Sequence, residues 1–416
     1  MAIAINTGLT RAPLPEGLRH LAGQFLDVDS HEMMPAQVWV REIGPIAEKL
    51  AEDWLHTGTD VSTNLNDPNV PGYETDNALI EAESIWKKKG PAAPGAVDVS
   101  RRIEIMDLMG VERQLMFPTG VGFYGLMMAG PLEDDYGFSP SIKENRKEYG
   151  KALVKAYNEW GMKVAKISDR IRPVLPVIGD SVSELMETAK ELIDNGIRAI
   201  WLPSGVPPGG KSPAHDDLDT FWDLMEKKRI AVCLHAGIES VYRSDEWRKA
   251  RVFENYKIFE EVRVDPWSVA NFHTTSQNFL TTMVLGGVFE RHPDLRFGAI
   301  EVNGAWIGPM CKMLDMWYTT GDPLGMKLGT DKSYRIPSKP SDYVKRNVRV
   351  TCFDFEPVDE YVTYYGLEDV VSFSSDYPHA EGGTDPIGKW YKRLAPLGPA
   401  IVEKFFVTNG KWLLPD

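Results

Sequence analysis

The sequence predicts an α/β protein built on one (β/α)8 TIM barrel with long insertions in the loops that follow its strands. Three observations support this prediction. Short apolar segments alternate with amphipathic helical stretches from about residue 97 onward, eight candidate strands can be counted, and histidines or carboxylates follow several of them. A length of 416 residues suits such a barrel. We expect an N-terminal extension over residues 1–24 and one barrel domain over residues 25–416.

The candidate strands are short and rich in β-branched and aromatic residues. They are Phe25–Asp29, Arg113–Pro118, Ile171–Ile178, Ala199–Leu202, Ile230–His235, Leu295–Glu301, Val348–Phe353 and Val370–Ser375. Several are apolar throughout, such as IAVCLH and VVSFSS, as expected for strands covered on both faces. Between them, Asp180 or Ser181 can cap a helix over DSVSELMETAKELIDNG, which Gly196 ends. The same helix signals recur over HDDLDTFWDLMEKKR.

Four connecting stretches exceed the usual loop of about two to six residues, namely residues 52–97, 119–142, 238–264 and 319–346. The second and third directly follow a strand, at the face where barrels carry their active sites. We expect them to form a lid and substrate pocket or an oligomer contact; plain surface decoration is the alternative.

Composition restricts the partners and the compartment. A net charge of −14 argues against nucleic acid and anionic membranes as partners. No stretch resembles a secretory signal or a membrane span, so a cytoplasmic location is expected. Cys233, Cys311 and Cys352 are widely spaced and outside any CxxC pair, so we expect three reduced, mostly buried thiols.

Acidic residues and histidines gather where the predicted strands end. Asp29 and His31 lie two apart after the first strand, so both side chains point to the same side of an extended chain. His235 ends the fifth strand, and Asp376 follows the eighth. Strand ends of a closed barrel meet at one mouth. Two imidazoles and two carboxylates there suit a divalent transition metal, Zn, Fe or Mn, which activates water or polarises a substrate carbonyl.

The chain resembles the amidohydrolase-related family, metal-dependent hydrolases and decarboxylases similar to aminocarboxymuconate semialdehyde decarboxylase. The resemblance spans residues 25–414, and its most specific segments are GGVFERHPDLRFGAIEVNGAWIGPM, SSDYPHAEG and the ending VTNGKWLL. It implies a metal pair after the first strand, a metal histidine on the fifth, and a metal-binding or proton-handling aspartate on the eighth. These roles fall on Asp29 with His31, on His235 and on Asp376.

Two positions depart from the decarboxylase pattern. The first strand carries DxH instead of HxH, and Glu301 stands after the sixth strand where such decarboxylases usually have a histidine. Glu301 is therefore either a general base or another metal ligand. His379, three residues after Asp376, is either a further ligand or a hydrogen-bonded loop histidine. With both as ligands the site has enough groups for two ions.

One more histidine and one missing lysine bear on the site. His273, in VANFHTTSQNF, is either a substrate-orienting residue or a histidine that packs within a helix. The lysine that is carboxylated in dinuclear hydrolases of the wider superfamily has no counterpart after the fourth strand, where the chain reads IWLPSG. This absence disfavours a dinuclear hydrolase.

The leading hypothesis is a metal-dependent enzyme that hydrolyses or non-oxidatively decarboxylates a small carbonyl- or carboxylate-bearing molecule, with Asp376 or Glu301 moving protons. An alternative on the same barrel is a dinuclear Fe or Mn monooxygenase that activates O2. A third hypothesis is a low-activity partner subunit of such an enzyme. We expect a homo-oligomer or a hetero-oligomer with a related barrel, because the family resemblance implies association.

Overall fold

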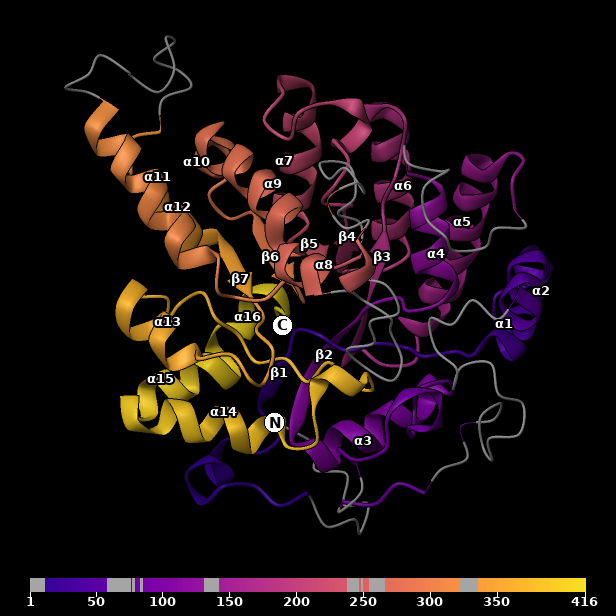
Figure 1. Cartoon of the computed structure of the whole chain (residues 1–416), viewed down its shortest axis with the longest axis horizontal. Helices are drawn as coiled ribbons and strands as arrows, with labels where there is room; N and C mark the ends of the chain where they lie inside the picture. The colour runs from indigo at the N-terminus through magenta and orange to yellow at the C-terminus, as the bar shows by residue number, and fades with distance from the viewer. Residues whose placement is uncertain are drawn as a thin grey trace.

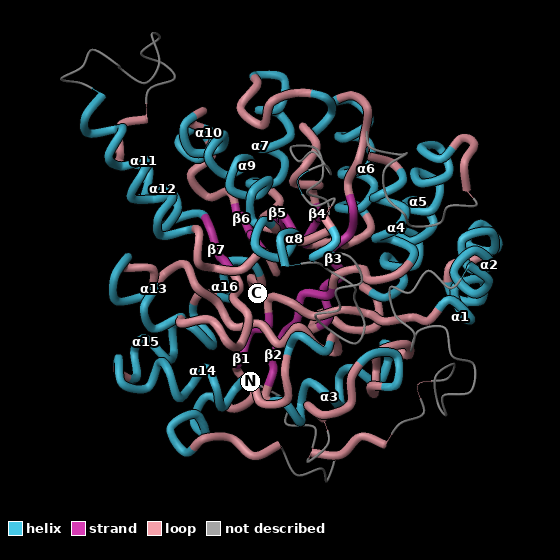
Figure 2. The backbone as a smooth tube through the Cα atoms, viewed as in Figure 1, coloured by secondary structure: helices cyan, strands magenta, loops and turns pink. Residues whose placement is uncertain are grey.

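Seven short parallel strands form one sheet whose spatial order follows the chain from β1 to β7 (Figure 1). They are β1 Phe25–Asp27, β2 Val111–Met116, β3 Ile171–Pro176, β4 Ala199–Trp201, β5 Ala231–His235, β6 Arg296–Ile300 and β7 Val348–Val350. The strands lie at the centre with helices around them (Figure 2). The computed structural model describes residues 12–57, 76, 79–82, 85–130, 142–237, 247, 250–253, 266–321 and 336–416.

The predicted eighth strand, Val370–Ser375, is not a regular strand, so the eight-stranded barrel is confirmed only in part. The segment nevertheless bonds to both edges of the sheet: Ser372 N donates to Val350 O at 3.0 Å, and Val28 N donates to Phe373 O at 3.2 Å. Its ladder is interrupted because Ser375 N donates to the side chain of Asp27 instead of to a backbone carbonyl. The next residue, Asp376, has a φ of 50°, which ends the extended run.

Sixteen α-helices are assigned within the described residues. They are α1 Ala36–Glu42, α2 Glu48–Thr57, α3 Arg102–Met109, α4 Val121–Met128, α5 Arg146–Val164, α6 Val182–Asp194, α7 Asp219–Lys227, α8 Pro266–Asn271, α9 His273–Leu285, α10 Val288–Arg291, α11 Ile307–Gly321, α12 Pro340–Asn347, α13 Val358–Tyr365, α14 Pro386–Leu394, α15 Pro399–Glu403 and α16 Gly410–Leu413. The longer connecting helices form the outer layer around the sheet (Figure 1).

The predicted helix signals are confirmed where they are clearest. At α6 the Ser181 hydroxyl accepts a hydrogen bond from Glu184 N, and the Glu184 carboxylate accepts one from Asp180 N. This reciprocal arrangement satisfies amide groups that a helix start leaves unpaired. Gly196 follows the helix with a φ of 90°, a conformation that a residue with a Cβ adopts only under strain.

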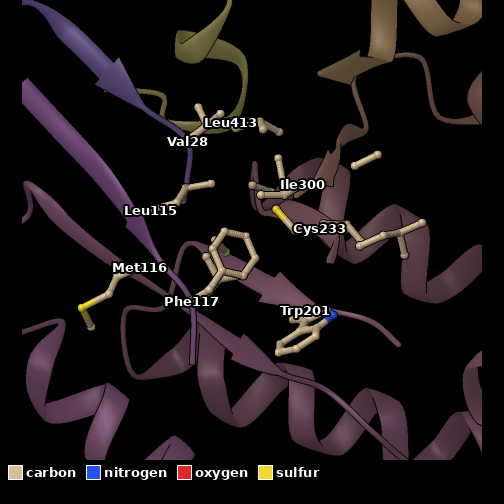
Figure 3. Close-up of a cluster of buried hydrophobic side chains, with 14 of the residues drawn as sticks. Val28, Leu115, Met116, Phe117, Trp201, Cys233, Ile300 and Leu413 are labelled. Carbon is tan, nitrogen blue, oxygen red and sulfur yellow. The ribbon is translucent and has the colours of Figure 1, made fainter. Parts of the chain in front are cut away.

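The sheet encloses an apolar core beneath the carboxyl ends of its strands. Figure 3 shows Val28, Leu115, Phe117, Trp201 and Ile300 in one cluster, and all five are fully buried. Full burial of each such side chain stabilises the fold by about 1.5–3 kcal/mol. The three cysteines are free and buried, as predicted. This packed interior fixes the strand ends, and with them the backbone that carries the polar residues described below.

The long insertions lie partly outside the described residues. The described start of the second insertion forms α4, whereas residues 131–141 are not described. Of the third, only residues 247 and 250–253 are described. A lid or pocket built from these segments therefore stays a prediction. Among the described helices, none is both long and apolar enough to cross a membrane.

Candidate metal centre

The strand ends bring five of the predicted site residues together at the carboxyl edge of the sheet. Asp29 and His31 follow β1, His235 ends β5, Glu301 follows β6, and Asp376 lies in the segment beyond β7. The Nε2 atom of His31 lies 3.4 Å from Asp29 Oδ1, 3.7 Å from Glu301 Oε2 and 3.5 Å from Asp376 Oδ1. His235 Nε2 lies 3.0 Å from Glu301 Oε2 and 3.7 Å from Asp29 Oδ1.

These groups form two overlapping sets that can each surround one metal ion. In the first set, Asp29, His31, His235 and Glu301 offer ligand atoms that all lie within 4.8 Å of one another. The second set contains His31, Glu301, Asp376 and His379. We call them the first set and the second set. Since His31 and Glu301 belong to both, the sets are adjacent parts of one centre.

Several buried polar atoms of the centre make no hydrogen bond with the described residues. Although the nitrogens of His31 and His235 lie close to carboxylate oxygens, neither Nε2 atom makes a hydrogen bond with any described residue. Asp29 Oδ1 and both oxygens of Asp376 are likewise buried without a hydrogen-bond partner among those residues. Buried polar atoms are rarely left unpaired. Their convergence fits a divalent cation, which imidazole nitrogens and carboxylate oxygens coordinate.

Two residues of the centre have unusual backbone dihedral angles. Glu301 has a φ of 55° and Asp376 a φ of 50°, in the left-handed region that residues with a Cβ rarely occupy. Each residue directly follows an extended segment, so the conformation turns the chain sharply where the side chain leaves the sheet. Such conformations cost about 1–3 kcal/mol and gather at functional sites. Thr351 holds the first one, because its hydroxyl accepts a hydrogen bond from Glu301 N at 2.7 Å.

Hydrogen bonds behind the centre orient its imidazoles. His235 Nδ1 lies 3.1 Å from the carbonyl oxygen of Ala236, which only an Nδ1–H can use. His31 Nδ1 lies 3.2 Å from the hydroxyl of Thr119. In both rings the bonded nitrogen is the one that faces away from the carboxylates. Histidines that bind metals usually donate their second N–H in this way, which leaves the other nitrogen free as a ligand.

The protein groups impose distinct protonation states on one another. Burial and the imidazoles of His379 and His235 hold the pKa of His31 well below its usual value. Burial resists charge on His235 and Glu301, yet their attraction raises the pKa of His235 to about 10 and lowers that of Glu301. Burial and the nearby charge of Glu301 raise the pKa of Asp376 well above its usual range. These shifts favour a neutral His31, an ion pair between His235 and Glu301, and the protonated form of Asp376.

Aromatic side chains form the wall beside the first set. The rings of Phe117 and Trp201 lie 4.5 Å and 5.1 Å from the ring of His235, measured between centroids. Both rings belong to the core cluster in Figure 3. A cavity of about 10 Å³ has Asp29, Glu301 and Asp376 among its lining residues, and this volume accommodates about one water molecule. The centre therefore contacts both aromatic rings and a small cavity.

His379 and His273, the remaining predicted site residues, occupy different surroundings. His379 Nδ1 lies 3.1 Å from Asp376 Oδ1, and its ring stacks on that of His31 with centroids 3.9 Å apart. His273 begins α9 and stacks on Trp306, with centroids 6.0 Å apart. It belongs to neither ligand set. Its predicted role in orienting substrate stays a prediction.

Thr119 and Arg102, like Thr351, were not predicted as residues of the centre. Thr119 follows β2 and contacts both His31 and His379. Buried Arg102 donates to the carbonyl oxygen of His31 at 2.6 Å from α3. Thr119 shares the strand-end position that identified the other residues, but an uncharged side chain gives no signal in a single sequence. Nothing in the sequence links Arg102, 71 residues away, to His31.

Comparison with known proteins supports both the fold and the family resemblance. The family model described as amidohydrolase matches residues 142–415. A solved amidohydrolase from Mycobacterium avium subsp. paratuberculosis K-10 is 18% identical with a TM-score of 0.64, covering 94% of this chain and 98% of that one. A search of curated proteins found no match.

Two solved decarboxylases also share the fold. The 5-carboxyvanillate decarboxylase from Sphingomonas paucimobilis is 14% identical with a TM-score of 0.56, covering 94% of this chain and 99% of that one. The 5-carboxyvanillate decarboxylase from Novosphingobium aromaticivorans DSM 12444, complexed with manganese and 4-hydroxy-3-methoxy-5-nitrobenzoic acid, is 16% identical with a TM-score of 0.55, covering 98% and 99% of the two chains. At these identities the similarity shows a shared fold.

Proposed function

Since the chain belongs to the amidohydrolase family, we propose that it is a metal-dependent enzyme that removes a carboxyl group, without oxidation, from a small organic carboxylate. The observation that supports this proposal is the convergence in the first set of buried, unbonded atoms of Asp29, His31 and His235. The unbonded carboxyl oxygens of Asp376 lie beside that set. The similarity of the fold to two decarboxylases adds support. Hydrolysis by the same centre is the nearest alternative.

The first set is the proposed ion-binding site. Asp29, His31, His235 and Glu301 supply two neutral imidazoles and two carboxylates, a donor set suited to Zn, Fe or Mn. A divalent ion held there lowers the pKa of water and polarises a substrate carbonyl or carboxylate. Since a ligand imidazole must be neutral, His235 would have to give up the proton that Glu301 and Asp29 hold on it before it could serve as a ligand.

Asp376 is the proposed proton donor. Its buried carboxyl group favours the protonated form and lies beside the first set. In a decarboxylation the bond to the carboxylate carbon breaks, CO2 leaves, and the electron pair stays on the remaining carbon. That carbon takes a proton from Asp376. His379, 3.1 Å from Asp376, is placed to return a proton to the carboxylate. In a hydrolysis, the deprotonated carboxylate of Asp376 would instead accept a proton from the attacking water.

The direct test combines metal analysis with CO2 release. We expect about one ion per chain and release of CO2 from members of a panel of aromatic and aliphatic carboxylates. Asp376→Asn should keep the ion and lose turnover, because the amide cannot deliver the proton. Hydrolysis of esters or amides without CO2 release would replace decarboxylation by hydrolysis. A wild-type protein that binds no ion would refute the proposal.

The second set supports one further candidate, a dinuclear Fe or Mn monooxygenase. Asp376 and His379, together with His31 and Glu301, offer atoms for a second ion next to the first. Carboxylate-rich pairs of Fe or Mn suit O2 chemistry. This candidate predicts about two ions per chain, consumption of O2 and loss of one ion in Asp376→Asn. The ion count of that variant therefore separates the two candidates.

A further inference from the structure

Thr119 joins two histidines of the centre through one hydroxyl group. Its Oγ1 atom lies 3.2 Å from His31 Nδ1 and 3.0 Å from His379 Nε2. The two rings stack, with centroids 3.9 Å apart and planes 21° from parallel. Each ring therefore presents one edge to the hydroxyl and the opposite edge to the carboxylates of the centre.

When both rings are neutral, the Thr119 hydroxyl cannot donate a hydrogen bond to both imidazole nitrogens. It has a single hydrogen to donate, and it accepts through its lone pairs. At most one of the two imidazole nitrogens can therefore be an acceptor, so the other must carry an N–H. The hydroxyl thus couples the tautomer of His31 to that of His379.

The surroundings of His31 decide which nitrogen carries the hydrogen. His31 Nε2 faces oxygens of Asp29, Glu301 and Asp376 at 3.4–3.7 Å but hydrogen-bonds to none of the described residues. A ligand nitrogen must present its lone pair, so the hydrogen belongs on Nδ1. His31 Nδ1–H then donates to Thr119 Oγ1. The Thr119 hydrogen remains for His379 Nε2, whose opposite nitrogen, Nδ1, lies beside Asp376.

Thr119 is itself held in place by buried groups. Thr119 N donates to Glu32 Oε1 at 3.0 Å, and the same fully buried carboxylate accepts a bond from Met34 N at 3.0 Å. The backbone on either side of the centre is paired through Phe117 N, which donates to Ser30 O at 2.7 Å. Both contacts tie the residues after β2 to those after β1. The hydroxyl is therefore fixed in advance of any binding event.

We propose that Thr119 is a positioning residue, whose hydroxyl accepts the Nδ1–H of His31 and donates to His379 Nε2. This arrangement leaves His31 Nε2 as a ligand in the first set and directs a His379 N–H toward Asp376. The inference deepens the proposed function and relies on its division between an ion site and a proton-handling pair. Partners of this kind, one step behind the ligands, typically contribute 10- to 100-fold to metal affinity, so about that range is expected here.

Nitrogen-15 NMR of histidine-labelled protein tests the tautomers directly, in the metal-free protein and after loading with Zn²⁺. Variants His31→Gln and His379→Gln assign the signals. Although burial opposes charge on His379, Asp376 and Glu381 raise its pKa well above the usual value, so its tautomer is read at a pH high enough to make the ring neutral. There we expect the hydrogen on Nδ1 in both histidines of the wild type. A hydrogen on Nε2 of His31 in the Zn²⁺-loaded protein, or on Nε2 of neutral His379, would overturn the proposal. The second result would also favour the dinuclear candidate.

Affinity for Zn²⁺, measured by competition with a chelator, supplies a second readout. Thr119→Val removes the hydroxyl at nearly constant volume and should weaken Zn²⁺ binding by about 10- to 100-fold. Thr119→Ser keeps the hydroxyl and should stay within about threefold of the wild type, on the same reasoning. Thr363→Val is the matched control, because among the described residues the Thr363 hydroxyl bonds only to carbonyl groups of its own helix, α13. Equal affinities of Thr119→Val and wild type would overturn the proposal.

The outcomes separate this inference from the proposed function. A wild-type protein with the expected tautomers but no CO2 release would refute decarboxylation and leave the role of Thr119 intact. If the wild type releases CO2 normally and the tautomers do not change in Thr119→Val, the role of Thr119 is refuted and the proposed decarboxylation stands. If Thr119→Val does not fold, the tautomers of the wild type and of Thr119→Ser still decide the question.

Discussion

Asp27 accepts two hydrogen bonds from Ser375, one from its backbone amide at 2.8 Å and one from its hydroxyl at 2.5 Å. Gln114 donates a further bond to the same carboxylate at 2.7 Å. The contact joins β1 to the irregular segment that follows β7. It therefore ties together the two chain regions that carry Asp29 and Asp376.

The first prediction concerns the pH dependence of this contact. Burial raises the pKa of Asp27 to about 7, although its hydrogen bonds oppose the rise. An aspartate in the unfolded chain titrates near pH 4, so the folded protein binds this proton more tightly. The stabilisation is complete below about pH 4 and is lost as the pH rises to about 7. The free energy of unfolding of the metal-free protein should fall across this window by on the order of 1.4 kcal/mol per pKa unit.

Asp27→Asn is the variant that isolates this effect. Gln114 Oε1 has no hydrogen-bond partner among the described residues, so a flipped Gln114 amide can accept from the new side chain. We expect the variant to fold and to lose the part of the pH dependence that lies between about pH 4 and 7. Urea unfolding at several pH values measures it. Parallel profiles for wild type and variant would show that Asp27 does not titrate there.

The second prediction concerns the first set. His235→Ala should remove the bound ion and, with it, activity, because His235 Nε2 is one of the converging ligand atoms. Loss of the ion and the activity together would also reject the hypothesis of a low-activity partner subunit. Elemental analysis and a turnover assay on the same preparation measure both quantities. An unchanged ion content would remove His235 from the site.

The third prediction separates the two roles open to Glu301. If Glu301 is a ligand, the Glu301→Gln variant should have a lower ion content, since an amide oxygen binds a cation more weakly than a carboxylate. If Glu301 is only a general base, the Glu301→Gln variant should keep its full ion content and lose its turnover. We expect the first result, because Glu301 Oε2 belongs to both ligand sets. A variant with normal ion content and normal turnover would exclude both roles.

The fourth prediction concerns Arg102, which is fully buried in α3. Its guanidinium donates to His31 O at 2.6 Å and to Gly95 O at 2.8 Å, and lies over the ring of Tyr377 at 4.9 Å. Arg102→Met should lower the free energy of unfolding by about 2–4 kcal/mol, since buried carbonyl oxygens lose their donors. Urea unfolding measures the change. Exposed Arg19→Met is the control, and it should shift stability by no more than about 0.5 kcal/mol.

The fifth prediction concerns the packing of α4 on α5, next to Thr119. A Cβ at Gly150 would lie 2.6 Å from Ala129 N and 2.7 Å from Gly125 O, both backbone atoms that cannot move aside independently. Gly150→Ala should therefore separate the helices and cost about 1–3 kcal/mol. Gly130→Ala is the comparison, because its nearest atom lies at 3.2 Å. Thermal unfolding that ranks Gly130→Ala as the more destabilised variant would contradict this account.

Local sequence patterns were enough to predict the strands and their polar ends. A continuous apolar run, IAVCLH, predicted β5, and Asp180 or Ser181 with Gly196 predicted the bounds of α6, because these signals act between neighbouring residues. The prediction failed at Val370–Ser375, where a side chain 348 residues away, Asp27, takes the bond that a regular ladder would use. No local pattern encodes that contact.

The sequence by itself determined which residues stand at strand ends, since parallel strands in chain order direct Asp29, His31, His235, Glu301 and Asp376 to one edge of the sheet. Only the tertiary structure decided which of them share an ion site and which nitrogen of each histidine faces it. Those choices depend on distances of 3–4 Å between distant segments and on uncharged groups such as the Thr119 hydroxyl. Such groups acquire a role only when folding places them beside a charged one.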